Sequence, residues 1–175
     1  MANKPAPGEV FLYPFLWKRE QISGETEGRK KRPVCIAVTV ATQDGETLVF
    51  ILPITTQPPL PNRHAIEVPQ IESQRTGLEV HVRKWIMLDE INTDVLDRSY
   101  VWDDRKPLGA FSAAFTAKVR SNLLALAKAG RAAVVSGAPG LSAWRIDTLA
   151  RARGMRSSIW DLGWPLVMAS RALRR

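Results

Sequence analysis

The sequence predicts a mainly β fold, in which a small barrel or sandwich of short strands is closed by one helix and followed by a basic tail. Short apolar runs recur through the first half of the chain, and turn-rich clusters such as "ATQDGET", "TQPPLPNR" and "SQRTG" separate them. Helical periodicity is confined to one segment after residue 110. The 175 residues, 45% of them hydrophobic, suffice for one domain with a hydrophobic core and leave room for a small appendage.

Five apolar runs are expected to form the strands. They cover residues 10–17, 34–40, 48–54, 65–68 and 85–88. Residues 112–130 are expected to form the helix, because their large apolar side chains fall on one helical face: Phe115, Val119, Leu123 and Leu126. Ser112 can cap the start of this helix, and Gly130 can end it.

A change of composition marks the last part of the chain. The segment "SGAPG", residues 136–140, has the glycines and the proline of a linker. The segment after it carries seven arginines against two aspartates, so it holds +5 of the total net charge of +8, together with three of the six tryptophans. We therefore expect a main domain at residues 8–136 and a basic extension at 137–175, which is either a tethered helical pair or partly disordered.

Charge and composition bound the function. A net charge of +8 and an isoelectric point of about 10.1 favour a polyanionic partner such as a nucleic acid. Cys35 is the single cysteine, which excludes an intrachain disulfide, and its apolar surroundings predict a buried thiol. Neither a signal peptide nor an apolar run of membrane-spanning length is present, so we expect a cytoplasmic protein that does not enter the membrane.

Several catalytic classes lack their residues. His64 and His81 lie in different segments without a spaced partner, so we expect no metal site and no cofactor. Neither a P-loop, nor a dinucleotide fingerprint, nor a G-x-S-x-G elbow occurs. RNA cleavage needs fewer groups, because the ribose 2′-hydroxyl is itself the nucleophile. The protein must supply a cation for the phosphorane charge, a hydrogen-bond donor and a proton acceptor.

The basic stretch "GRKKRP", residues 28–33, offers that cation. Proline restricts the residue before it to extended backbone, so Arg32 would be held at a defined angle where the strand begins and could bind a phosphate. Arg29, Lys30 and Lys31 would then contact the flanking RNA backbone. The alternative is a charged loop that only stays solvated before the chain enters the core.

Two further groups lie at strand ends. Thr55 and Thr56 follow an apolar run and could present hydroxyls to the same phosphate, although threonine is common at strand ends without any such role. Asp89 and Glu90 follow the run "WIML" and could accept a proton. The alternative for each carboxylate is ordinary surface solvation.

The order of "GEV", "GRKKRPV", "LPITT" and "WIMLDEINTD" over about residues 8–130 resembles the PemK/MazF-like toxins of bacterial toxin–antitoxin systems. The resemblance implies an SH3-like small barrel with a terminal helix and a homodimer. It also implies a metal-independent endoribonuclease that cleaves single-stranded mRNA, inhibits growth and is neutralised by a small antitoxin protein.

The same resemblance assigns roles to individual residues. Arg32 and Thr55 match the catalytic pair of the family, and Thr56 matches a neighbouring hydroxyl position. Asp89 matches a carboxylate that some members carry, and Glu90 is one step away. We take Arg32, Thr55 and either carboxylate as the candidate catalytic residues.

Two departures from the family pattern bear on function. The chain reads "EINT" where many members have glutamine, isoleucine, arginine and threonine, so Asn92 stands in place of an arginine and is the candidate RNA contact there. The loop after the first strand is long and aromatic, and its Trp17 could stack an RNA base or cover the barrel. The alternative to the toxin is therefore a non-catalytic protein of the same fold that binds nucleic acid or an antitoxin.

Overall fold

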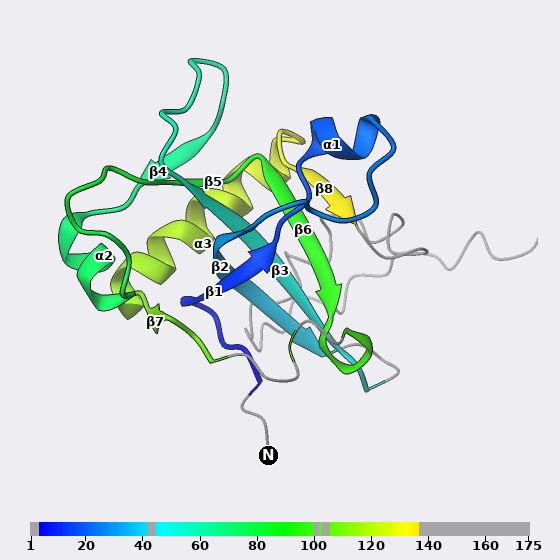
Figure 1. Ribbon diagram of the computed structural model, residues 1–175, viewed down its shortest axis with the longest axis horizontal. Coiled ribbons are helices and arrows are strands. Elements are labelled where there is room, and N and C mark those ends of the chain that lie inside the picture. The colour runs from blue at the N-terminus through cyan, green and yellow to red at the C-terminus, as the bar shows by residue number, and fades with distance from the viewer. Residues whose placement is uncertain (1–3, 42–44, 100–101, 103–105, 137–175) are drawn as a thin grey trace, which may run out of the picture.

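The chain folds into a curled antiparallel sheet with a long helix across one face (Figure 1). The structure is a computed structural model that describes residues 4–41, 45–99, 102 and 106–136. The expected extension, residues 137–175, lies outside the described residues. The strands are β1 (Glu9–Pro14), β2 (Lys31–Ala41), β3 (Thr47–Thr55), β4 (Ala65–Glu67), β5 (Trp85–Met87), β6 (Glu90–Val95), β7 (Gly109–Ala110) and β8 (Ala133–Ser136). The helices are α1 (Lys18–Ile22), α2 (Gln70–Arg75), the 3₁₀ turn η1 (Leu96–Arg98) and α3 (Ala113–Lys128).

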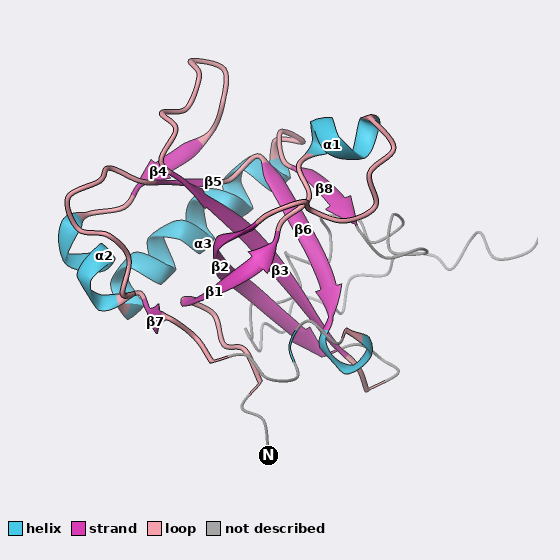
Figure 2. Cartoon of the chain, in the orientation of Figure 1, coloured by secondary structure: helices cyan, strands magenta, loops and turns pink. Residues whose placement is uncertain are grey.

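β3 is the centre of the sheet. One of its edges pairs with β2 over most of its length, and the other edge is shared by β6 and β5 in turn. A register shift between Ile36 and Val38 marks a bulge in β2, which raises the local twist. The sheet therefore curls into a half-barrel, and Figure 2 shows its strands crossing in front of α3. The predicted mainly β class with a C-terminal helix is confirmed.

Apolar side chains cover both faces of the sheet, since successive side chains of a strand point to opposite faces. In β1, Val10 packs into the cluster between the sheet and α3. Phe11 and Tyr13 point the other way, into a second cluster that includes Phe15 and Trp17. The polypeptide directly after β1 thus belongs to the face opposite α3.

The sequence predicts α3 correctly, because the spacing of its apolar residues and its capping residues indicate the same segment. Its apolar face is buried as expected, at Phe115, Val119, Leu123 and Leu126. The Ser112 hydroxyl accepts a hydrogen bond from the Phe115 N–H at 3.2 Å, which caps the first turn. Gly130 follows the helix with φ of +66°, a left-handed conformation that glycine adopts without cost. None of the helices within the described residues is long and apolar enough to cross a bilayer.

Several elements differ from the expectation, among them β6, η1 and β7, which follow the last expected strand. The run expected at residues 10–17 leaves the sheet at Pro14, and helix α1 follows it. The short helix α2 fills a segment with no predicted element. The chain also continues past α3 into β8, which pairs parallel to β6. These elements are short, so no periodic pattern could mark them in advance.

Candidate functional site

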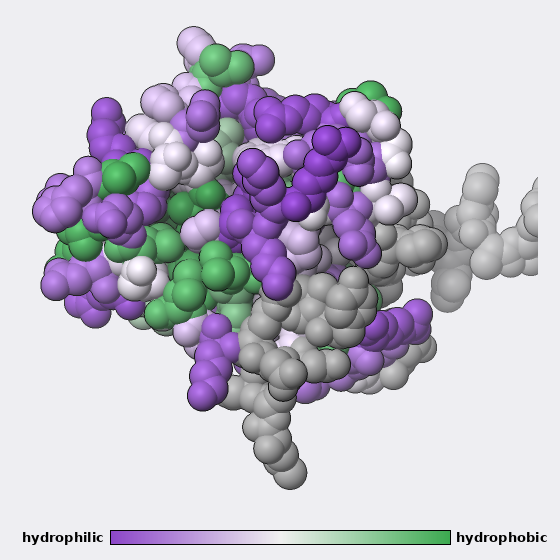
Figure 3. Space-filling view, in the orientation of Figure 1, coloured by the Kyte–Doolittle hydropathy of each residue, from purple (hydrophilic) through white to green (hydrophobic). Residues whose placement is uncertain are grey.

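A cavity of about 740 Å³ opens on the face opposite α3. One wall is the segment between β1 and β2, which contains α1 and the basic stretch before β2. The other wall is the loop after β3, residues 57–63, and Met87 and Glu90 also line the space. Figure 3 shows hydrophilic side chains gathered between α1 and this loop, whereas apolar side chains gather over β1 and β7.

The structure brings Arg32 and Thr55 to this cavity from adjacent strands, β2 and β3. Arg32 is the second residue of β2 and pairs with Tyr13 of β1. Burial lowers the pKa of the Arg32 guanidinium, since desolvation disfavours the charged form. The Arg32 Nε atom is buried and has no hydrogen-bond partner among the described residues. The cavity therefore holds a partly desolvated cation with an unused donor.

The Thr55 hydroxyl can still donate one hydrogen bond. Its Oγ1 accepts a hydrogen bond from the Gln57 N–H at 3.1 Å. Because a hydroxyl both accepts and donates, the hydrogen of Thr55 Oγ1 stays available to a ligand. Thr56 is the next residue along the chain, is exposed, and is not among the described residues that line the cavity.

The residues of the basic stretch do not all line the cavity. Arg29 and Lys30 line the cavity, whereas Lys31 is exposed and is not among the described lining residues. Arg29 also pairs with Glu25, four residues earlier in the same loop. Gly28 lets this loop cross closely over the polypeptide after β1, because an added Cβ would lie within 2.5 Å of Pro14 O and would clash with the Phe15 backbone.

Trp17 lies under the Arg32 guanidinium. The Arg32 Cζ is 5.1 Å from the centroid of the Trp17 ring, which is within the range of a cation–π interaction. Trp17 is only 8% exposed, and its ring packs edge-on against Phe15. Of the two expectations for Trp17, cover of the sheet agrees with this burial.

The two candidate carboxylates are held by an arginine that the sequence did not indicate. Arg63 donates from Nε to Asp89 Oδ2 at 2.5 Å and from Nη2 to Asp89 Oδ1 at 2.9 Å. Arg63 Nη2 also donates to Glu90 Oε1 at 2.8 Å. The hydrogen bond to Asp89 is the main cause that raises the pKa of Arg63. A single arginine in a turn-rich loop carries no sequence signal, because only the pairing of β4 with β5 brings it to Asp89.

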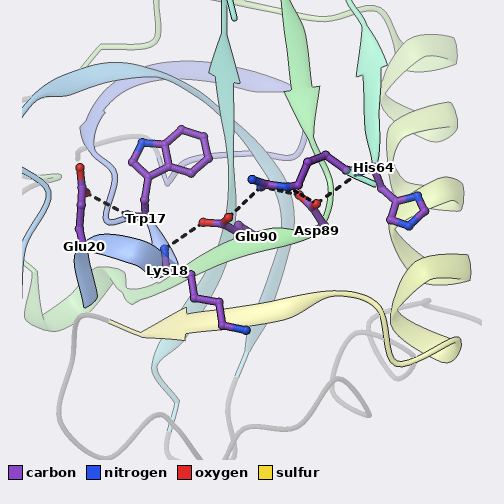
Figure 4. A network of polar contacts seen from close by, with 7 residues as sticks. Trp17, Lys18, Glu20, His64, Asp89 and Glu90 are labelled. Carbon is purple, nitrogen blue, oxygen red and sulfur yellow. Dashed lines mark hydrogen bonds and ion pairs between the residues drawn. The ribbon is translucent and has the colours of Figure 1, made fainter. Parts of the chain in front are cut away.

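Glu90 links the two walls of the cavity. Its Oε1 binds Arg63, and its Oε2 accepts the Lys18 N–H at 2.9 Å, at the start of α1. In Figure 4, Glu90 lies between Trp17, Lys18 and Glu20 on one side and Asp89 and His64 on the other. Of the two carboxylates, only Glu90 is among the described residues that line the cavity.

Asn92 is 3% exposed and lies away from the cavity lining. In the amide orientation that satisfies both of its groups, Asn92 donates to Leu16 O at 2.8 Å and to Val135 O at 3.2 Å, and it accepts from Leu16 N at 2.8 Å. The Asn92 side chain thus binds two backbone segments, Leu16 and Val135, and the RNA contact expected at this position stays a prediction. The described residues contain no group of three or more histidine, cysteine, aspartate or glutamate side chains arranged to hold a metal ion.

The sequence that forms this fold matches a known protein family. A family profile described as "PemK-like, MazF-like toxin of type II toxin-antitoxin system" matches residues 6–127. The chain belongs to this toxin family. The match to the PemK-like toxins spans β1 to α3 and includes the described residues that line the cavity, but it ends before β8. No curated protein sequence matches the chain.

Proposed function

We propose that the protein is a growth-inhibiting toxin that cuts single-stranded mRNA without a metal ion. The observation that carries the proposal is the meeting of Arg32 and Thr55 in one cavity, with Arg29 and Lys30 at its wall. A phosphate in this cavity would meet the guanidinium of Arg32 and a hydroxyl whose hydrogen is free to donate. The family supports the same function, and we further propose that the toxin acts as a homodimer and is neutralised by a small antitoxin protein.

The proposed reaction is transfer of the phosphoryl group within the RNA. The 2′-oxygen bonds to phosphorus, the bond from phosphorus to the 5′-oxygen breaks, and the products are a 2′,3′-cyclic phosphate and a 5′-hydroxyl. Arg32 stabilises the charge that builds on the phosphoryl oxygens, and Thr55 donates a hydrogen bond to one of them. Glu90 is the candidate acceptor of the 2′-hydroxyl proton, water protonates the leaving 5′-oxygen, and the hydroxide that remains takes the proton back from Glu90. Arg29 and Lys30 bind flanking phosphates.

A second candidate function is RNA or antitoxin binding without cleavage. One observation favours it: Arg63 pairs with both Asp89 and Glu90, so neither carboxylate is an unpaired base. In this case RNA would bind in the same cavity and stay intact. The two candidates differ only in what happens to the bound RNA, and a cleavage assay separates them.

The test is incubation of the purified protein with single-stranded RNA in the presence of EDTA. We expect fragments with 2′,3′-cyclic or 3′-phosphate ends and 5′-hydroxyl ends. Arg32→Ala should lower the rate by about a hundredfold or more, as loss of a transition-state donor does. Arg83→Ala is the matched control, because Arg83 also lies over a tryptophan ring, 5.2 Å from the centroid of Trp85, but is not among the described residues that line the cavity.

Three results would contradict the proposal. Cleavage that appears only with added divalent metal would exclude the metal-independent mechanism. Cleavage that Arg32→Ala leaves unchanged would show that the nuclease activity does not come from this cavity, and RNA that binds but stays intact would support the second candidate.

A further inference from the structure

The Arg32 guanidinium lies over the Trp17 ring, and the charges of Glu20 and Arg19 also act on it. Among the described residues Arg32 has no ion pair, and its Nε has no hydrogen-bond partner. The aromatic contact of the guanidinium is the Trp17 ring, at 5.1 Å from Arg32 Cζ to the ring centroid. A guanidinium that lies over an indole is restrained in its plane, while its N–H groups remain available to a phosphate.

The Trp17 backbone is held by side chains on both sides. Asn92 binds the N–H and the carbonyl of Leu16, at 2.8 Å each. The Glu20 carboxylate accepts the Trp17 N–H at 3.1 Å, and the Glu90 carboxylate accepts the Lys18 N–H at 2.9 Å. Each of three consecutive amides therefore has its own side-chain acceptor, which fixes the backbone on both sides of Trp17.

These restraints originate in the sheet. Glu90 and Asn92 are two residues apart in β6, so their side chains leave the same face of the strand toward residues 16–18. Glu90 is itself held by Arg63, which is 28% exposed at its side chain and comes from the opposite wall of the cavity. A continuous set of contacts thus runs from β6 through the backbone of Trp17 to the guanidinium of Arg32.

We propose that Trp17 is a positioning residue that orients the Arg32 guanidinium, and that Glu90 and Asn92 set the position of Trp17. The inference rests on the proposed function for its effect on RNA, and it assigns Asn92 a role away from the substrate. It also separates the two expectations for Trp17, because a ring that is 8% exposed and faces Arg32 has little surface for an RNA base.

Kinetics of two variants test the effect on RNA. Trp17→Leu removes the aromatic face, and its kcat should fall by about tenfold, the size expected for a partly desolvated cation–π contact. Trp17→Phe keeps a smaller aromatic face and should lose less. Binding of an RNA that carries a 2′-deoxy nucleotide at the cleavage position should change little in both variants. A ring that stacks a base would instead weaken this binding, and that result would overturn the inference.

The free protein offers a second measurement that does not depend on cleavage. With arginine labelled by nitrogen-15, the Nε–H resonance of Arg32, assigned through Arg32→Lys, should be shifted upfield by the Trp17 ring current. Trp17→Leu should abolish this shift, and Trp17→Phe should reduce it. The matched control is Trp85→Leu, which should move the resonance of Arg83, over Trp85 at 5.2 Å, and leave that of Arg32 in place.

The two measurements separate the two proposals. If the Arg32 resonance does not respond to Trp17→Leu, the positioning role is wrong, whether or not the protein cuts RNA. If the resonance responds and the wild-type protein binds RNA without cutting it, the proposed nuclease function is wrong and the contact between Trp17 and Arg32 stands. Thermal melting of each variant identifies a loss of activity that comes from unfolding, and Trp17→Phe then decides the comparison, because it fills most of the same space.

Discussion

Arg32 shows how neighbours in the sequence and in space set the environment of one cation. Pro33 favours extended backbone at Arg32, and Arg32 lies in β2 as that restriction predicts. Burial then removes part of its hydration, which lowers its pKa yet leaves an arginine charged at neutral pH. Lysine would keep the charge but not the planar set of donors that a phosphate needs.

Cys35, also in β2, has the opposite kind of environment and gives a prediction on stability. Its thiol is 1% exposed, and burial raises its pKa to about 12 from an ordinary value of 9.0. The unfolded chain therefore releases this proton at a lower pH than the folded protein does. The stability that the neutral thiol contributes is complete below pH 9 and is lost as the pH rises toward 12.

Cys35→Ala should remove this part of the alkaline loss of stability. Between pH 9 and 12, the free energy of unfolding of the wild type should fall more steeply than that of the variant, by about 1.4 kcal/mol per pH unit. Urea unfolding at several pH values measures both slopes. Parallel slopes would show that the thiol ionises in the folded protein as easily as in the unfolded chain.

The segment between β1 and β2 is the element that builds one wall of the cavity. Gly28 gives it its course, because the polypeptide crosses the backbone of Pro14 and Phe15 too closely for any Cβ. Arg29 and Lys30 follow directly and line the cavity. The position of the basic residues is thus a consequence of one glycine.

Gly28→Ala should therefore lower both stability and RNA affinity. The added methyl group meets backbone atoms, which cannot rotate away, so the loop must shift at a cost of about 1–3 kcal/mol. The shift moves Arg29 and Lys30 away from the phosphates, and binding isotherms should show a weaker complex at low salt.

Gly24→Ala in the same loop is the control for this variant. Gly24 has φ of +90°, so alanine is strained there by about 1–2 kcal/mol, but no atom lies within 4 Å of an added Cβ. This variant should lose a comparable amount of stability and keep its RNA affinity. Equal affinities for the two variants would show that the crossing at Gly28 does not place the basic residues.

At the scale of the whole molecule, the strand after α3 connects the C-terminal part of the described chain to the site. β8 pairs with β6 from Glu90 to Thr93, and the carbonyl of Val135 accepts the Asn92 amide. Since Glu90 and Asn92 of β6 hold residues 16–18, the pairing of β8 with β6 stabilises this wall of the cavity. Residues 137–175 add +5 of net charge beyond this strand.

A chain that ends at Ser136 should fold and cleave RNA, whereas a chain that ends at Gly130 should lose stability and activity together. The longer chain keeps the pairing of β8 with β6, and the shorter one exposes the β6 edge and removes Val135 O, one of the two acceptors of the Asn92 amide. The chain ending at Ser136 should also bind RNA more weakly at low salt, with a shallower salt dependence, because fewer cations contact phosphates. Thermal melts, cleavage rates and binding isotherms at several salt concentrations measure these effects.

An insoluble or inactive chain ending at Ser136 would contradict this boundary and would make residues 137–175 part of the folded domain. An active chain ending at Gly130 would show that β8 does not support the site.

The sequence by itself determined the features that depend on neighbouring residues. The period of Phe115, Val119 and Leu123 with a serine cap predicts α3, and apolar runs between turn clusters predict the strands around it. The "RP" and "TT" positions pointed to Arg32 and Thr55, because backbone restriction and strand ends are local properties.

Only the tertiary structure decided which distant residues meet. Arg63 reaches Asp89 and Glu90 because β4 pairs with β5, and Asn92 turns to Leu16 because β6 lies beside the segment after β1. Strand pairing brings together residues that are 20 to 80 positions apart, and the free energy of such contacts comes from burial and hydrogen bonding that no local pattern records. Arg63 therefore carried no signal in the sequence. Glu90 and Asn92 were candidates from the sequence, but only the fold shows which groups they contact.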